Sequence, residues 1–226
     1  MAYDPRTVAF VAEIFHPPAL HDARRLQSLH NELFPDPRLG YRNFALVPGG
    51  ASLANPVAQP GAASTATFLA DRIQVREEGT GATLEEFCAR VAVIGRLAVE
   101  RLGVPIFIAQ QATIRSLVNP RRERDSRLFL ARDVLRLPDA ASGKFGRAAS
   151  LVGLRFVFPG TAEDPGTYNL RVESYNGDPR SLFVEAVGAF PPVVAASAAE
   201  RLATSVQATY RFLTERALAF VESYEG

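Results

Sequence analysis

Apolar and polar residues alternate along residues 7–15, a pattern typical of a strand with one buried side. In residues 19–34 the apolar positions instead recur every three or four residues and share one face of a helix. The FPDP motif at the end of this segment contains prolines that stop the helix. The chain therefore opens with a predicted strand and an amphipathic helix.

Two further strands are predicted by the same alternation, at residues 41–47 and 67–78. The segment between them, residues 48–64, is rich in proline, glycine and alanine. Because such residues favour turns and interrupt regular structure, we expect a loop here. This loop is the best candidate for a mobile segment.

The clearest helix start lies at Thr83, because Glu86 follows in the spacing of a capping box. An apolar stripe then continues to Gly103, a residue type that ends helices in the left-handed conformation. A strand over residues 105–118 follows. The first half, residues 1–118, therefore has the order β-α-β-β-α-β, which is that of a ferredoxin-like sandwich.

The second half, residues 119–226, is predicted to contain a helix, three strands and a final helix. The first helix lies within residues 120–137, since Asn119 can cap it and a proline suits its first position. The strands cover residues 151–158, 167–175 and 181–190. Ser197 and Glu200 form a second capping box for the final helix, which at about 1.5 Å per residue reaches roughly 40 Å.

These elements predict an α+β protein. We expect two ferredoxin-like layers of antiparallel sheet covered by helices, with a long C-terminal helix. The halves 1–118 and 119–226 are expected to pack as one globular unit. Since the final helix is longer than one small sheet requires, we expect it to lie across more than one layer or to reach a partner.

The composition adds few constraints. The chain has 226 residues and a formal net charge of +1, so no global field attracts nucleic acid or anionic lipid. A single cysteine, Cys88, excludes an intrachain disulfide and fits a reducing compartment. The first residues lack the features of a signal peptide, and no apolar run is long enough to span a bilayer. We therefore expect a cytoplasmic protein without a membrane partner.

All three histidines lie between positions 16 and 30. His21 and His30 are nine residues apart on one predicted helix, which turns them to opposite sides, so they cannot hold one metal ion together. We expect His30 on the apolar face, bonded to a backbone carbonyl, His16 at a strand end, and His21 in solvent. No cysteine or carboxylate cluster has metal-ligand spacing. The sequence therefore predicts no metal site and no cofactor.

Catalytic signatures are missing from the sequence. Cys88 lies in an apolar helical stripe without a neighbouring base, so we expect an unreactive thiol. The glycine-rich segments VPGGAS and EGTGAT match neither phosphate-loop pattern and are interpreted as turns. There is no G-x-S-x-G or H-E-x-x-H motif. We predict no catalytic residue and favour a protein that is not an enzyme.

One segment, residues 115–127, carries a local positive field. Near a helix start, arginines can hold phosphate groups, because the guanidinium fork matches phosphate oxygens. The candidate phosphate or nucleic-acid ligands are Arg115, Arg121, Arg122, Arg124 and Arg127. A solvated surface turn with internal ion pairs is the alternative, and it is favoured because no aromatic residue lies within the segment to stack on bases.

Polar side chains also recur on the predicted strands. If one sheet face is open, they can line a polar groove or the pocket of a small-molecule site. The candidate pocket groups are Arg72, Arg76, Arg115 and Glu173. A plain solvated sheet face is the alternative.

The last helix carries a second apolar row outside its main stripe. The members of this row are Ala208, Phe212 and Ala219. A helix with apolar residues on two sides often contacts two bodies, so the row predicts a subunit contact. Burial within the monomer is the alternative.

Four segments carry a resemblance to known proteins: DRIQVREE, TLEEFCARVAVIGRLAVERLG, the strand ending IRSLVNP, and the C-terminal AERLATSVQATYRFLTERALAFVESY. Together with the order of elements, they resemble a sporadically distributed family of uncharacterised bacterial proteins. The resemblance covers about half of the chain. It implies an α+β fold and a bacterial source; because that family has no assigned activity, it lends no functional residue.

Three functions remain open at this point. The first is a non-catalytic interaction or assembly protein that associates with itself or with a protein partner. The second is binding of nucleic acid or phosphate through the arginine-rich segment. The third is a small-molecule-binding protein or enzyme with a pocket between sheet layers. The lack of chemical signatures and the long final helix favour the first.

Overall fold

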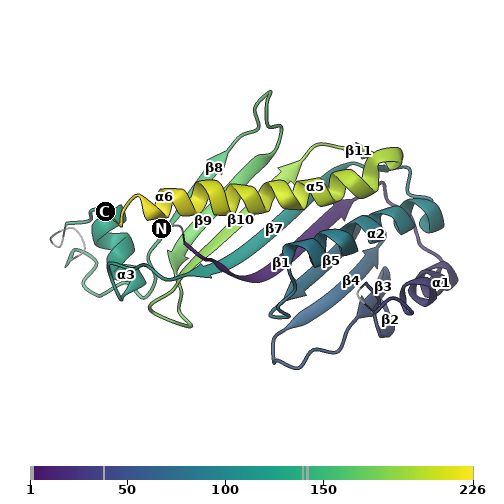
Figure 1. Ribbon diagram of the computed structural model, residues 1–226, viewed down its shortest axis with the longest axis horizontal. Coiled ribbons are helices and arrows are strands. Elements are labelled where there is room, and N and C mark those ends of the chain that lie inside the picture. The colour runs from purple at the N-terminus through teal and green to yellow at the C-terminus, as the bar shows by residue number, and fades with distance from the viewer. Residues whose placement is uncertain (1–2, 38, 139, 141–142, 226) are drawn as a thin grey trace.

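The computed structural model describes residues 3–37, 39–138, 140 and 143–225, which build one large antiparallel sheet with helices on one face (Figure 1). The sheet has nine strands in the order β2-β3-β4-β5-β1-β7-β10-β9-β8. The strands are β1 (Arg6–Phe15), β2 (Asn43–Val47), β3 (Gly50–Ala54), β4 (Ala63–Leu69), β5 (Arg72–Glu78), β7 (Ala109–Val118), β8 (Gly153–Phe158), β9 (Thr167–Ser174) and β10 (Leu182–Phe190). Two short strands, β6 (Ile106–Phe107) and β11 (Val193–Val194), pair separately.

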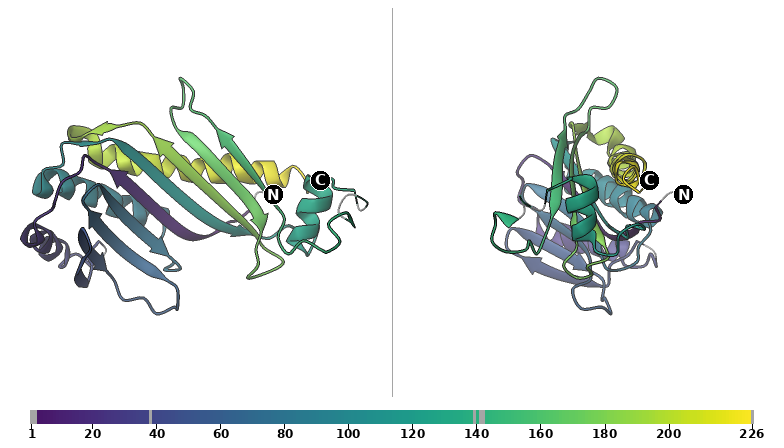
Figure 2. Two further views of the ribbon diagram at one scale, coloured as in Figure 1. Left: turned by 180° about the vertical axis from the view of Figure 1, so that it is seen from behind. Right: turned by 90° about the vertical axis from the view of Figure 1, so that its left-hand side faces the viewer.

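Two long helices run across the same face of the sheet (Figures 1 and 2). The first is α2 (Leu84–Leu102). The second, called here the C-terminal helix, joins α5 (Ala198–Arg211), the π-helical η3 (Phe212–Ala217) and α6 (Leu218–Glu222). The other helical elements are α1 (Ala23–Leu33), α3 (Ser126–Leu128), the π-helical η1 (Phe129–Val134) and the 3₁₀ turn η2 (Ala195–Ser197).

A single sheet replaces the two ferredoxin-like layers expected from the sequence. The reason lies in β7, which pairs with β1 on one side and with β10 on the other. The pairing with β10 runs from Val118 with Leu182 to Gln110 with Phe190. Strands from both halves of the chain therefore share one sheet. The broader prediction of an α+β protein with a large antiparallel sheet and a long C-terminal helix is confirmed.

Residues 48–64 were expected to form a loop, but they contain β3 and the start of β4. Pro48 and Gly49 make the turn of the β2–β3 hairpin, where Gly49 has a φ of +80° that favours glycine. A side chain at Gly50 would overlap the carbonyl oxygen of Phe68 on the neighbouring strand. The small residues that suggested flexibility therefore allow two strands to approach closely.

One predicted helix start is confirmed and another is not. The Thr83 hydroxyl accepts the amide of Glu86, and the Glu86 carboxylate accepts the amide of Thr83, which completes the capping box. Gly103 ends α2 in the left-handed conformation, with a φ of +74°. At the C-terminal helix, Ser197 instead donates its hydroxyl to the carbonyl of Val194, so its capping box does not form.

The helix predicted within residues 120–137 is shorter than expected, because α3 and η1 cover only Ser126–Val134. Asp125 caps it by accepting the amide of Arg127. Asn119, the expected cap, accepts the hydroxyl of Ser181 at 2.8 Å instead. The preceding arginines are therefore in an irregular segment.

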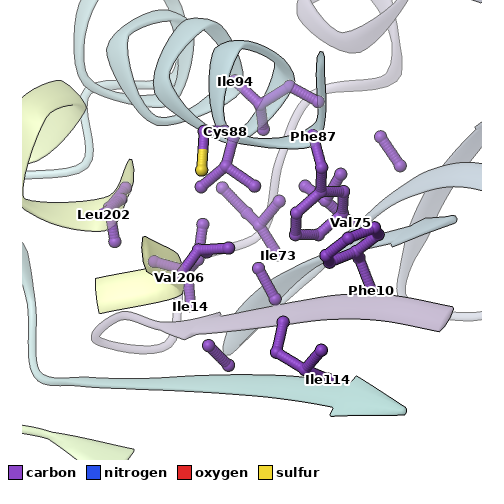
Figure 3. Packing of buried hydrophobic residues seen from close by; sticks show 14 of the residues in the cluster. Phe10, Ile14, Ile73, Val75, Phe87, Cys88, Ile94, Ile114, Leu202 and Val206 are labelled. Carbon is purple, nitrogen blue, oxygen red and sulfur yellow. The ribbon is translucent and has the colours of Figure 1, made fainter. Parts of the chain in front are cut away.

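The core lies between the sheet and the two long helices (Figure 3). Phe87 of α2 stacks on Phe10 of β1, with ring centroids 5.3 Å apart. Leu202 of the C-terminal helix lies against Gly95 of α2, where any added side chain would clash with it. This close approach fixes the two helices relative to each other. Within the described residues, no helix covers the opposite face, called here the open face.

Candidate functional site

Alternating charges cross the open face. Arg115 on β7 pairs with Glu185 on β10 at 2.7 Å. Arg171 on β9 contacts the same Glu185 carboxylate at 3.3 Å. At the other end of the row, Arg76 and Glu78 on β5 form an ion pair, and Glu78 lies 3.7 Å from Arg115. The charges of this row are compensated by their neighbours.

Three of the four expected pocket groups belong to this row. Arg76 and Arg115 take part as described, and Glu173 lies 3.5 Å from Arg171. Arg72 lies at the beginning of β5, with its guanidinium 6.0 Å from the ring centroid of Phe15. Because there is one large sheet, these groups line its open face and do not enclose a space between two sheet layers.

The arginine-rich segment is held against the C-terminal end of the chain. The backbone amides of Arg121 and Arg122 donate to the Glu225 carboxylate, each at 2.9 Å. The Arg121 guanidinium lies 4.8 Å from the ring centroid of Tyr3 and 3.4 Å from the carboxylate of Glu222. The hydroxyl of Tyr3 also donates to Glu225. This segment therefore anchors the end of the C-terminal helix.

The remaining arginines of the segment are spread over different surroundings. Arg127 pairs with Asp125 at 2.6 Å, and this hydrogen bond lowers the pKa of the Asp125 carboxyl. Arg124 is exposed, and its backbone amide donates a hydrogen bond of 2.8 Å to the Glu123 carboxylate. Arg115 is engaged on the open face. The structure does not gather the five arginines around one common point.

The second apolar row of the C-terminal helix is divided by the π-helical turn η3. Phe212 stacks face to face on Tyr168, with ring centroids 4.3 Å apart. Ala208 lies one turn earlier and lines a separate hollow beside Phe190. Ala219 is exposed. The wider π turn changes the rotation per residue, so Phe220 follows Phe212 along this face in place of Ala219.

An apolar hollow of about 600 Å³ lies between this part of the helix and strands β8 and β9. We call it the aromatic groove. Its walls are Phe156, Phe158, Tyr168, Leu170, Phe212 and Phe220. The polar side chains of Arg216 and Asp164 lie at its border. Its size and mostly apolar lining are those of surfaces that bind apolar groups.

The rings of the groove hold one another in place. Phe158 meets Phe212 edge to face at 5.3 Å, and Phe156 meets Phe220 in the same way at 5.5 Å. Such aromatic pairs add about 0.5–1.5 kcal/mol each beyond the area they bury. Burial and the nearby carboxylate of Asp164 raise the pKa of Tyr168 to about 12, so its ring stays neutral.

Strand β8 forms one edge of the sheet, beside the groove (Figure 1). Val152, just before the strand, accepts the amide of Ser174 at 2.9 Å and so faces β9. Because the direction alternates along a strand, the backbone groups of Arg155 and Val157 point outward. Val157 is 60% exposed and Phe158 is 40% exposed. An apolar edge, whose outward backbone groups pair with no strand among residues that the structure describes, thus adjoins an apolar groove.

The sequence indicated single parts of the aromatic groove but not that they lie together. It predicted the β8 strand and singled out Phe212, but nothing indicated that β8 lies at an edge. The groove also joins Phe156 to Phe220 across a long stretch of chain. The available signal was the FVF run at residues 156–158, which places aromatic rings on one side of a strand and leaves an apolar residue on the other.

The histidines and the cysteine lie outside this groove. His30 is buried and its Nε2 lies 2.9 Å from the carbonyl oxygen of Tyr41, as expected. Cys88 is buried, and burial raises the pKa of its thiol to about 11. His21 does not face solvent: α1 begins at Ala23, so His21 precedes the helix and lies half-buried beside His16.

The fold defines a class: an α+β protein built on one open antiparallel sheet with two long helices on a single face. The chain matches no known family model, and no curated protein is significantly similar to it. The resemblance to uncharacterised bacterial proteins therefore stays a prediction. Among the described residues, no helix is both long and apolar enough to cross a membrane.

Proposed function

We propose that this protein is a non-catalytic interaction protein that self-associates through the outer edge of β8. The observation that carries the proposal is the outer edge of β8, which pairs with no other strand of the described chain and lies beside the aromatic groove. Edge strands present unpaired N–H and C=O groups that readily pair with another strand. Because Val157 and Phe158 make this edge apolar, a second copy of the same strand is a suitable partner.

A twofold axis at Phe156 gives a self-complementary register. The resulting antiparallel pairs are Phe156 with Phe156, Leu154 with Phe158, and Arg155 with Val157. Opposite residues then share a sheet face, as strand pairing requires. The outward backbone groups of Arg155 and Val157 also meet as a hydrogen-bonded pair. A shift that sets Arg155 opposite itself would bring two like charges together.

The same pairing covers the exposed side of the aromatic groove. Phe156 already contacts Phe220, so the aromatic row of one copy would continue into that of the other. Full burial of a side chain such as Val157 or Phe158 is worth about 1.5–3 kcal/mol. These gains favour association of two copies over an exposed edge.

Sedimentation equilibrium at micromolar concentration tests this proposal. We expect a dimer for the wild type and a monomer for Val157→Lys, because the added charge would lie directly opposite Arg155 of the other copy. Val194→Lys is the matched control, since Val194 is 58% exposed but lies on β11, away from β8. A wild-type monomer, or a Val157→Lys variant that dimerises as tightly as the control, would contradict the proposal.

A second candidate function is binding of an apolar carboxylate in the aromatic groove. Arg216 lies at its border and carries the positive charge that a carboxylate requires. A fluorescent fatty acid serves as the probe. Saturable binding that is weakened in Arg216→Gln would support this function, whereas no binding, or equal binding by the variant, would exclude it.

Binding of nucleic acid by the arginine-rich segment stays a prediction. Its motivation is the exposed Arg122 and Arg124 near the irregular start of α3. Phosphate contacts weaken steeply as salt rises. Binding in low salt that disappears when both arginines are changed to glutamate would favour this function over the proposed one.

A further inference from the structure

His16 and His21 lie side by side where the chain leaves β1. Their ring centroids are 5.3 Å apart and their planes are tilted by 59°. His16 is 1% exposed, and His21 is half-buried. The connecting segment is fixed, since the amide of His16 donates to the carbonyl of Asp71 at 2.9 Å and that of Ala19 to the carbonyl of Ala70 at 2.7 Å.

Backbone carbonyls place the proton on the same nitrogen of both rings. Nδ1 of His16 lies 2.9 Å from the carbonyl oxygen of Pro17, and the ring of His21 hydrogen-bonds to the carbonyl of Leu69. A carbonyl oxygen only accepts, so the ring nitrogen facing it carries the hydrogen. In His21 this nitrogen is Nδ1, because its Nε2 has no hydrogen-bond partner. Each neutral ring therefore presents a bare lone pair at Nε2.

Both Nε2 atoms are buried and lack a hydrogen-bond partner among the described residues. A buried polar atom left unsatisfied destabilises the fold, so two adjacent ones require an explanation. In the described chain, the two Nε2 atoms also do not hydrogen-bond each other.

We propose that His16 and His21 bind one transition-metal ion through their Nε2 atoms. Imidazole nitrogen suits zinc, copper and nickel ions. In metal sites the other ring N–H is usually held by a carbonyl or carboxylate, as both Nδ1 atoms are here. No third histidine, cysteine or carboxylate joins the pair in the described chain, so water or an external ligand completes the coordination.

From the sequence we predicted no metal site, because His21 and His30 point in opposite directions and no cysteine or carboxylate cluster has ligand spacing. These two residues are indeed in separate surroundings. The pair that forms is His16 with His21. It arises because α1 begins at Ala23, which leaves His21 in the connection that turns back towards β1.

Histidine-selective ¹⁵N NMR of the metal-free protein, followed by titration with Zn²⁺, tests the proposal. We expect the hydrogen on Nδ1 in both His16 and His21, and both Nε2 signals should move when Zn²⁺ is added. His30 is an internal control, because its Nε2 is already held by the carbonyl of Tyr41. A hydrogen on either Nε2 of the pair, or Nε2 signals unchanged by Zn²⁺, would overturn the proposal.

A chelator competition gives the second readout. Removing one imidazole in His21→Gln should weaken Zn²⁺ binding at least about tenfold. Even the loss of a residue that only hydrogen-bonds a metal ligand weakens metal binding by about this factor. His21 is the better position to change because it is only half-buried, and circular dichroism verifies that the variant folds. A folded His21→Gln variant that binds Zn²⁺ as tightly as the wild type would overturn the proposal.

Discussion

At the scale of single residues, burial determines which side chains are available for chemistry. Cys88 is a potential nucleophile, but burial raises its thiol pKa to about 11, so it is protonated near neutral pH. His30 is buried, and its Nε2 hydrogen-bonds to the carbonyl oxygen of Tyr41. Of the three histidines, His16 and His21 each have a buried Nε2 without a hydrogen-bond partner among the described residues. The histidine pair therefore has the ring nitrogens that are available to bind a ligand.

His21 makes the stability of the fold depend on pH. Burial and the neighbouring His16 lower its pKa in the folded state, whereas the unfolded chain has the ordinary value of about 6.5. As pH falls through about 6.5, the unfolded chain binds the proton first, and the fold loses stability. In metal-free buffer, the urea midpoint should fall between about pH 7.5 and about pH 5.5, and fall less in His21→Gln. An equal fall in both proteins would contradict this account.

At the scale of elements, two glycines allow neighbouring elements to approach closely. Gly50 permits β3 to lie against β4, and Gly95 permits α2 to lie against the C-terminal helix. Both glycines are therefore packing residues within regular structure. The π-helical turn η3 has a comparable role, because it turns Phe220 towards β8.

Gly50→Ala tests this interpretation. The added methyl would overlap the carbonyl oxygen of Phe68, and backbone cannot easily move aside, so we expect the free energy of unfolding to fall by about 1–3 kcal/mol. Gly143→Ala is the control, since no atom of the described residues lies within 4 Å of its added methyl. Urea unfolding measures both. Equal stability of the two variants would show that β3 is a loosely held segment after all.

The sequence predicted elements with clear periodicity and missed those defined by distant partners. Alternation was enough for β1 and β9, and the Thr83 capping box was enough for α2. The β3 strand was missed because its small residues carry little alternation. Neither the pairing of β7 with β10 nor the edge position of β8 has a local signal, since both depend on which strands meet. The aromatic groove could not be predicted for the same reason, because it forms between β8, β9 and the C-terminal helix.

At the scale of the whole molecule, one sheet combines an open face of paired charges with an apolar edge. The charges on the open face compensate one another, so this face can remain in water. The β8 edge has no such protection apart from Arg155, and Val157 and Phe158 lie exposed along it. The proposal of self-association through β8 rests on this asymmetry.

Oxidative cross-linking of cysteine variants tests that central claim most directly. The proposed register places Phe156 opposite its own copy in a non-hydrogen-bonded antiparallel pair. In such a pair the Cα atoms lie about 4.5 Å apart, a distance that a disulfide can span. Phe158 lies opposite Leu154, so it does not meet its copy. Native Cys88 is buried and should not interfere. We expect a covalent dimer for Phe156→Cys and none for Phe158→Cys; the reverse result, or no cross-link in either, would contradict the account.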